Sequence, residues 1–229
     1  MLKKFLVVLM SLSMIFLTGC GAGGDEKKAG DDTAAKVETG DADKGKTSDE
    51  SKVAKPDGKA LIVYYSRTGD NYEVGVIEKG NTRIVADMIK DKIPGADVFE
   101  IKPVKDYPAD YRECTEVAKA EKESDARPEI AGKVENFEQY DTIFIGYPNW
   151  WSDMPMLMYT FLESYDFNGK TIVPFCTSSS DYFIGKEELQ KYAKGSTVLD
   201  GLGVRGKRCQ ENPEDVRKEV NAWLEKSGF

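Results

Sequence analysis

The sequence predicts a three-layer α/β domain in which helices cover both faces of a doubly wound, five-stranded parallel sheet. From residue 59 to the end of the chain, apolar segments of strand length alternate with segments of helical pattern. Such alternation places a helix in each crossover between parallel strands. The main strand segments are continuous apolar runs, as is typical of strands covered on both faces. A mostly parallel sheet accounts for both observations.

The first 20 residues lie outside this domain and have the pattern of an export signal. Two lysines precede the apolar segment 5–17, and the sequence LTGC then ends at Cys20. The apolar segment is too short to span a membrane comfortably. Its ending resembles the lipobox of bacterial lipoproteins, which implies that Cys20 is diacylated and anchors the chain to the outer face of the cell membrane. The alternative is a plain signal peptide with an incidental cysteine.

The next segment, residues 21–58, is predicted to be a disordered tether. It consists mainly of small and charged residues and has no aromatic residue. Such a segment buries too little apolar surface to offset its chain entropy. The chain is therefore expected to comprise a lipoprotein signal peptide with a lipobox (1–20), a tether (21–58) and one folded domain (59–229).

Composition excludes several kinds of chemistry. The sequence has no histidine, so Ser-His-Asp and Cys-His catalysis and His-ligated zinc or haem are ruled out. Beyond Cys20, the cysteines Cys114, Cys176 and Cys209 form no C-x-x-C pair, so no metal site is expected, and one disulfide among them remains open. The net charge of −8, without clustered positive charge, argues against nucleic acid as a partner.

The first strand and helix enclose the first candidate ligand segment. The apolar run 61–65 is followed by a helix whose apolar face consists of Ile84, Val85, Met88, Ile89 and Ile93. Asn81 or Thr82 is expected to cap this helix. Between strand and helix lie the segments SRTG (66–69) and GNT (80–82). Hydroxyls and backbone N–H groups at a helix N-terminus favour a phosphate, although the same residues are also common in ordinary turns.

The remaining elements follow in order along the chain. Further strands are expected over 96–101, 141–147, 171–176 and 196–204, and further helices over 110–124, 153–162, 186–193 and 213–226. Pro155 suits the first turn of its helix, and Asn212 is expected to cap the last one. Pro174 weakens the prediction for its strand, because proline removes a ladder donor.

Two more loops follow strands at the edge where doubly wound sheets bind ligands. The loop 146–155 contains three aromatic residues, which suit a planar ligand, although Trp150 or Trp151 could instead pack on neighbouring helices. The loop 176–185 combines hydroxyls with Tyr182, which could cover the outer face of a ligand; a serine-rich surface turn is the alternative. Cys176 is expected to be a packed thiol.

These segments together resemble the flavodoxin superfamily, and within it the flavodoxin-like lipoproteins of anaerobic, mostly Gram-positive bacteria. The matching motifs are YYSRTG with GNT, IFIGYPNWWSDMPM, FLESYDFNGKTIVPFCTS and LDGLGVRG. The resemblance covers essentially all of residues 59–229, and IGYPNWW followed by DMP is its most specific part. It implies a flavodoxin-like sheet of strand order 2-1-3-4-5 and noncovalently bound FMN.

The resemblance also implies which residues bind this cofactor. The phosphate would be held by Ser66, Arg67, Thr68, Gly69, Asn81 and Thr82. The isoalloxazine would be lined by Tyr147, Pro148, Asn149, Trp150 and Trp151, with Thr177, Ser178 and Tyr182 at its far edge. No catalytic side chain and no metal ligand is implied.

This sequence departs from the family pattern in two places. Residues 70–80 are inserted between the two halves of the phosphate segment, and we expect them, with Tyr72, to fold outward or over the flavin. Residues 178–181 replace a histidine or acidic residue followed by glycines that several relatives carry. The second departure weakens the role expected for the third loop.

The expected function is electron transfer by an FMN-binding protein tethered to the outer face of the cell membrane. Its partners would be a redox protein or a quinone-like acceptor. Two alternatives remain open: an FMN-dependent NAD(P)H:quinone-type oxidoreductase, and a flavin-free binding lipoprotein on the same fold.

Overall fold

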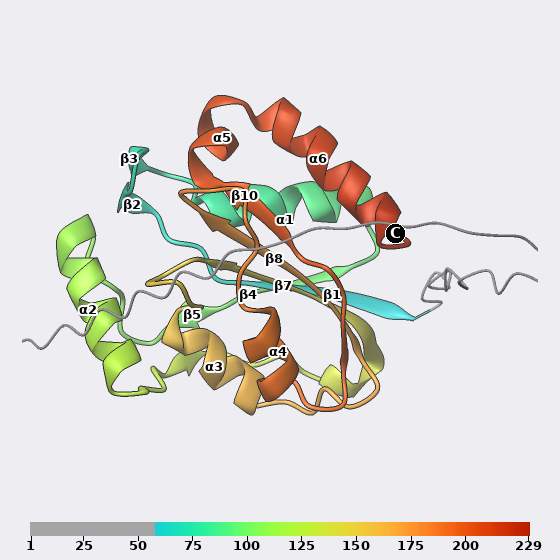
Figure 1. Ribbon diagram of the computed structural model, residues 1–229. Helices are drawn as coiled ribbons and strands as arrows, with labels where there is room; N and C mark the ends of the chain where they lie inside the picture. The colour runs from blue at the N-terminus through green and yellow to red at the C-terminus, as the bar shows by residue number, and fades with distance from the viewer. Residues whose placement is uncertain (1–57) are drawn as a thin grey trace, which may run out of the picture. The chain divides into compact units, whose positions relative to one another are not determined.

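The computed structural model describes residues 58–229, which form an α/β domain (Figure 1). The predicted signal peptide, Cys20 and all but the last residue of the predicted tether lie outside the described residues. Within residues 58–229, no helix is long and apolar enough to cross a membrane.

The central sheet is parallel and has the strand order predicted from the resemblance. It contains β1 (Lys59–Tyr64), β4 (Asp97–Glu100), β7 (Tyr140–Pro148), β8 (Thr171–Ser178) and a fifth strand in two pieces, β9 (Thr197–Val198) and β10 (Leu202–Arg205). The pairing runs β10-β8-β7-β1-β4, with β9 also on β8. Taken in chain order, these positions are 2-1-3-4-5, so the doubly wound topology is confirmed.

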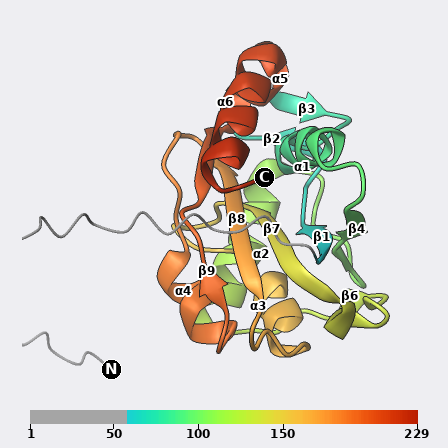
Figure 2. The ribbon, with the colours of Figure 1, turned by 90° about the vertical axis from the view of Figure 1, so that its right-hand side faces the viewer.

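Helices cover both faces of this sheet (Figures 1 and 2). One face carries α1 (Asn81–Lys92), α5 (Gly206–Glu211) and α6 (Pro213–Lys226), and the other carries α3 (Met156–Glu163) and α4 (Lys186–Tyr192). Three further elements are the hairpin of β2 (Gly69–Asn71) and β3 (Gly75–Ile77), the pair β5 (Lys102–Pro103) and β6 (Ile130–Ala131), and the short helix η1 (Phe137–Gln139). Helix α2 (Tyr111–Glu123) and the β2–β3 hairpin lie at the carboxyl end of β1, on the left in Figure 1.

Alternate residues of each strand supply two separate apolar cores. In β1, Leu61 and Val63 face the core under α3 and α4, whereas Ile62 and Tyr64 face the core under α1 and α6. All four side chains are buried. This arrangement explains why the strand is apolar throughout its buried length.

The prediction of one continuous fifth strand over 196–204 is wrong, because this strand has two pieces, β9 and β10. Val198 pairs with Ile172, but Leu202 pairs with Phe175, so one extra residue is accommodated between β9 and β10. The Ile172 carbonyl accepts a hydrogen bond from the N–H of Leu199, so the backbone polar groups of Ile172 point toward the fifth strand. Because this direction alternates along a strand, the backbone polar groups of Pro174 point the same way. Pro174 has no N–H to donate there, and the ladder breaks beside it.

Two helix starts differ from the predicted capping, and a third agrees with it in position only. Neither Asn81 nor Thr82 caps α1; Gly80 holds the N-cap position, and the Ser66 hydroxyl accepts from the N–H of Arg83 at 3.1 Å. Pro155 occupies the N-cap position of α3 rather than its first turn. Asn212 is in the N-cap position of α6 but makes no side-chain capping bond. The first helix is thus capped from a distant loop, which brings the two halves of the phosphate segment together.

Candidate functional site

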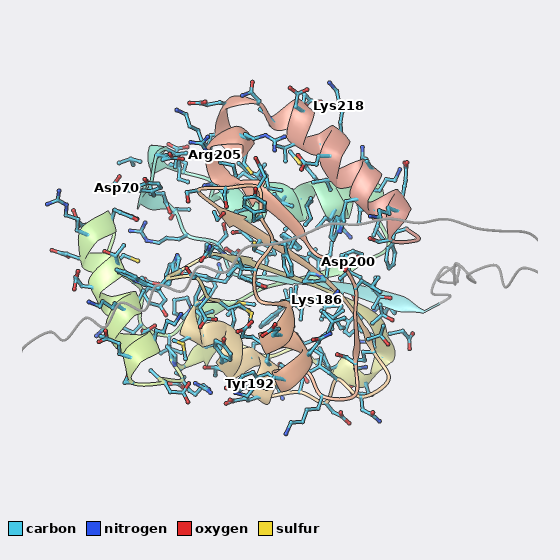
Figure 3. The ribbon with its side chains drawn as sticks, viewed as in Figure 1. Asp70, Lys186, Tyr192, Asp200, Arg205 and Lys218 are labelled. Carbon is cyan, nitrogen blue, oxygen red and sulfur yellow. The ribbon has the colours of Figure 1, made fainter. Side chains whose placement is uncertain are left out.

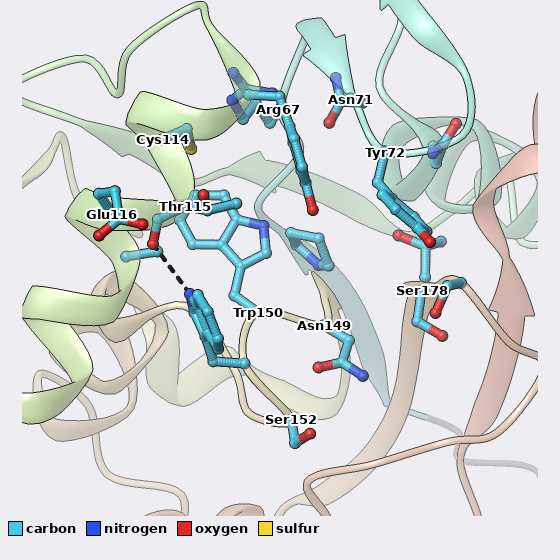
Figure 4. Close-up of a pocket in the computed structure, with 17 residues that line it drawn as sticks. Arg67, Asn71, Tyr72, Cys114, Thr115, Glu116, Asn149, Trp150, Ser152 and Ser178 are labelled. Carbon is cyan, nitrogen blue, oxygen red and sulfur yellow. Dashed lines mark hydrogen bonds between the residues drawn. The ribbon is translucent and has the colours of Figure 1, made fainter.

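A cavity of about 510 Å³ opens at the carboxyl ends of β1, β7 and β8 (Figure 4). Its volume is within the range of roughly 300–1,000 Å³ that is usual for small-molecule sites. It is lined by Arg67, Asn71, Tyr72, Asn81, Tyr111, Cys114, Thr115, Glu116, Ala118, Pro148, Asn149, Trp150, Trp151, Ser152, Thr177, Ser178 and Ser179. The position is the one at which doubly wound sheets bind ligands.

Unpaired backbone donors lie beside one end of this cavity, and two of them belong to residues that line it, Arg67 and Asn81. Among the described residues, the N–H groups of Ser66, Arg67 and Thr68 have no hydrogen-bond acceptor in the protein, and neither do those of Asn81 and Thr82 in the first turn of α1. Donors at a helix N-terminus attract an anion, because the helix dipole adds to the hydrogen bonds. This donor set fits a phosphate group without any cationic side chain.

Gly80 allows the two halves of the phosphate segment to approach closely. A Cβ at this position would lie 2.2 Å from the Ser66 hydroxyl and 2.5 Å from the Arg67 carbonyl. Neither approach is tolerable, so any side chain here would separate the strand-end loop from the helix. The close approach of the donors therefore depends on a glycine at residue 80.

The side chains of the phosphate segment have mostly structural contacts. The Arg67 guanidinium donates to the carbonyls of Asp70, Pro108 (2.8 Å) and Ala109 (2.7 Å), so it ties the segment to the start of α2. Of the six predicted phosphate residues, Arg67 and Asn81 line the cavity, whereas Ser66, Thr68, Gly69 and Thr82 do not. A phosphate in the cavity would therefore be bound mainly by backbone N–H groups of this segment, rather than by its side chains.

Buried polar contacts hold the three loops in register. The hydroxyls of Thr82 and Thr177 lie 2.8 Å apart, and both residues are buried. The Thr177 carbonyl also accepts from the N–H of Asn149 at 2.8 Å. One residue at the end of β8 thus joins the α1 N-terminus to the loop after β7.

The other end of the cavity is aromatic. Trp150 packs edge-on against Tyr65 and Tyr107, with ring centroids 5.6 and 4.9 Å apart. Trp151 is 49% exposed, and its indole N–H donates to the Thr115 carbonyl at 3.0 Å (dashed in Figure 4). Trp150 packs on Tyr65 and Tyr107, which lie outside the helices, whereas Trp151 contacts helix α2, and both indoles line the cavity.

The turn that presents these indoles has an unfavourable backbone conformation. Trp150 and Asp153 exchange two hydrogen bonds, of 2.9 and 3.1 Å, and both residues between them have positive φ, 55° for Trp151 and 58° for Ser152. Two positive φ values are the requirement of a type I′ turn, which usually carries Asn-Gly. An L-residue pays roughly 1–2 kcal/mol for this conformation. Strain of this kind is typical of functional sites.

Two predicted ring-binding residues lie away from the cavity. Tyr147 is fully buried, and its hydroxyl donates to the Ile184 carbonyl at 2.7 Å, so it packs in the core beneath the loop after β8. Tyr182 is 80% exposed and does not line the cavity. Pro148, Asn149, Thr177 and Ser178 do line it, together with the two indoles.

Sequence reasoning named Tyr72 as a residue that could fold over the ligand but missed the rest of the outer wall of the cavity. Asn71 and Tyr72 reach it from the β2–β3 hairpin, and Tyr111, Cys114 and Ala118 reach it from α2. The helical pattern over 110–124 places Tyr111, Cys114, Val117 and Ala118 on one side of the helix, but nothing in that pattern indicates what this side contacts. Burial raises the pKa of the Cys114 thiol.

The fold and the cavity define a doubly wound α/β protein with a ligand site at the carboxyl edge of its sheet. The chain belongs to the flavodoxin family, whose model matches residues 59–227.

Solved structures agree with this family. Two are putative flavoproteins, from Bacteroides eggerthii DSM 20697 and Bacteroides uniformis ATCC 8492, each 29% identical with a TM-score of 0.56. Each alignment covers 73% of this chain and 96% or 98% of the other. A flavoprotein from Lactobacillus acidophilus NCFM, solved in complex with FMN, is 23% identical over 67% of this chain and 97% of its own, with a TM-score of 0.49. No curated protein matches the chain.

Proposed function

We propose that this protein is an FMN-binding electron carrier, held at the outer face of the cell membrane by a lipidated Cys20. The observation that carries the proposal is the cavity itself. Its lining runs from Arg67 and Asn81, beside the unpaired backbone donors, to the indoles of Trp150 and Trp151. One end suits a phosphate and the other suits a planar ring, as FMN requires.

The cofactor is bound without a covalent link. The backbone N–H groups of Arg67 and Asn81, which line the cavity and have no acceptor among the described residues, would hold the phosphate, and the loop after β7 would hold the ring. FMN supplies the electron-transfer chemistry, and the protein supplies orientation and surroundings. Trp150, fixed against Tyr65 and Tyr107, offers an apolar surface at the ring end.

The proposed location rests on the sequence. The segment ending at Cys20 resembles a lipobox, and its two lysines without a twin arginine favour general secretion of an unfolded chain. FMN then enters the domain outside the cell. The partner is a redox protein or a quinone-like acceptor at the membrane, and the net charge of −8 favours a basic partner surface.

Cofactor binding is tested first by adding FMN to the protein and recording flavin absorption and fluorescence through a reductive titration. We expect quenched flavin fluorescence and reduction by a low-potential donor. Unchanged FMN fluorescence at every protein concentration would contradict the proposal. Steady oxidation of NAD(P)H by the loaded protein would instead favour the oxidoreductase alternative.

The anchor is tested by Cys20→Ala in the native host. We expect the wild-type protein in the membrane fraction and the variant outside it, because a lipidated cysteine supplies the membrane affinity. Equal amounts of the two proteins in the membrane fraction would contradict the lipid anchor.

A further inference from the structure

The β2–β3 hairpin, most of which belongs to the 70–80 insertion, lies at the edge of the cavity. Asn71 and Tyr72 at its tip line the cavity, and Figure 4 shows the Tyr72 ring extending from the hairpin toward Ser178. Tyr72 is nevertheless 58% exposed. The Tyr72 ring at the edge of the cavity therefore has an exposed apolar face that a ligand could cover.

One side of the hairpin is fixed to the start of α2. The N–H of Asp70 donates to the Ala109 carbonyl at 3.3 Å, and the Arg67 guanidinium binds the same carbonyl at 2.7 Å. The rings of Tyr72 and Tyr111 lie beside each other, with centroids 5.9 Å apart. This side of the hairpin belongs to the wall that α2 forms.

The other side is fixed to the end of the chain. Arg205, the last residue of β10, makes a bidentate pair with Glu73 at the hairpin tip, with N–O distances of 2.9, 3.0 and 3.2 Å. Figure 3 shows Arg205 at the hairpin end of the sheet. Gln210 in α5 donates to the Lys79 carbonyl at 2.9 Å and so holds the base of the hairpin.

The backbone of Glu73, which pairs with Arg205, has an unfavourable conformation. Glu73 has φ 63°, a left-handed conformation that glycine or asparagine would adopt more easily. Val76, on the same hairpin, is 81% exposed, so the apolar packing of the hairpin is limited to Ile77 and the contact between Tyr72 and Tyr111. Its position over the cavity therefore depends on the polar contacts at its two sides.

We infer that Tyr72 covers the bound cofactor from outside the sheet, and that the Arg205–Glu73 pair is a latch that keeps the hairpin closed over it. This inference rests on the proposed FMN site. Arg205 and Glu73 act as positioning residues, because they hold Tyr72 in place without lining the cavity. The insertion thus supplies the outer cover that the exposed Tyr182 does not supply in this structure.

The latch is tested by the rate at which FMN leaves the loaded protein, followed by the return of flavin fluorescence after trapping of free FMN. Glu73→Gln and Arg205→Gln each remove the ion pair and retain side-chain size. We expect each to speed release about two- to fivefold, in proportion to a partly exposed bidentate pair. The double variant should release FMN no faster than either single one, and the charge-swapped pair, Glu73→Arg with Arg205→Glu, should recover slow release.

The matched control is Arg217→Gln, which removes an ion pair of 2.9 Å between α6 and Asp91 in α1, away from the cavity. We expect its release rate to equal that of wild type. If Arg205→Gln fails to fold by circular dichroism, Arg205→Lys, which retains the charge but not the bidentate geometry, tests the same point. Wild-type release rates in both Glu73→Gln and Arg205→Lys would overturn the latch.

The cover is tested by Tyr72→Ala beside Val76→Ala, which truncates another exposed residue of the same hairpin. Loss of the aromatic contact should speed release about three- to tenfold in the first variant and leave the second unchanged. Faster release from Tyr182→Ala but not from Tyr72→Ala would overturn the assignment. If wild type itself fails to quench FMN fluorescence, the proposed function fails; if wild type binds FMN and all hairpin variants match it, only the inference fails.

Discussion

At the scale of single residues, the turn that presents Trp151 is a place where sequence and backbone conformation disagree. Ser152 has positive φ without being glycine. Ser152→Gly relieves this strain, and the greater freedom of glycine in the unfolded chain offsets part of the gain. We expect the free energy of unfolding to rise by about 0.5 kcal/mol in a urea titration.

The opposite substitution is the control. Ser152→Val places a β-branched residue at positive φ and should lower the free energy of unfolding by about 1 kcal/mol or more. A Ser152→Val protein as stable as wild type would show that the turn carries no strain.

Burial also sets the reactivity of the three thiols in the described part of the chain, which are all unpaired. It raises the pKa of Cys176 to about 11 and that of Cys209 to about 12. The thiolate is the reactive form, so we expect no alkylation of these two cysteines at neutral pH in the folded protein and full alkylation in urea. Peptide mass spectrometry after iodoacetamide treatment measures this, and rapid labelling of the folded protein would contradict it.

Individual site residues could be predicted where the chemistry is local. Asn149, Trp150 and Trp151 follow a buried strand directly, so their place at the carboxyl edge follows from the strand alone. Tyr147 was misplaced because it is one residue earlier, where the strand still alternates into the core. Tyr72 was expected to fold outward or over the flavin, but its contact with Tyr111 is a tertiary contact that no local pattern encodes.

At the scale of elements, the Thr82–Thr177 contact couples α1 to β8. Because both hydroxyls are buried, Thr82→Val leaves the other hydroxyl unpaired and should lower the free energy of unfolding by roughly 1–3 kcal/mol, as should Thr177→Val. The double variant leaves no unpaired group. Its loss should be smaller than the sum of the two single losses.

This double-mutant cycle is measured by urea unfolding of the four proteins. A coupling energy of about 1 kcal/mol in magnitude is expected for groups in direct contact. Strict additivity would show that the two hydroxyls do not stabilise each other.

The order of elements could also be predicted from the sequence, whereas two of their details could not. Apolar runs such as 61–65 and 141–147 identified the central strands, and helices between them imposed parallel pairing. Pro174 signalled a weak ladder, but the resulting break appears in the neighbouring strand, beyond the reach of a local pattern. The insertion was recognised at 70–80, but its hairpin form was not predicted. The residue of positive φ at the tip is Glu73, where a glycine or asparagine would have indicated a turn.

At the scale of the whole molecule, paired carboxylates predict an acid limit to stability. Hydrogen bonds from Lys59, Lys186 and Lys218 lower the pKa values of Asp97, Asp200 and Asp215, respectively. Burial alone would raise the pKa of Asp181, but the N–H of Arg205 and the guanidinium of Arg208 outweigh it and the pKa is lowered. A lowered pKa in the folded state stabilises the protein above the unfolded value, about 3.9, and this stabilisation is lost as the pH falls through the folded value.

We therefore expect the urea midpoint to be nearly constant between pH 6 and pH 8, where the absence of histidine leaves few groups to titrate, and to fall below about pH 4. Asp181→Asn should make the fall of the urea midpoint below pH 4 less steep, because it removes one of the carboxylates with a lowered pKa. A midpoint that changes steeply near pH 6.5 would contradict the prediction.

The contact between Glu73 and Arg205 also bears on the order in which the site can form. It joins residues 132 positions apart, and Arg205 lies close to the end of the chain. During synthesis or export from the N-terminus, the strand-end loop and α1 therefore emerge long before their closing partner. Contacts of such separation form late in folding, because loop closure costs entropy before any contact compensates for it. The latch proposed above therefore closes only after the segment that contains β10 has joined the sheet, later than the strand-end loop and α1.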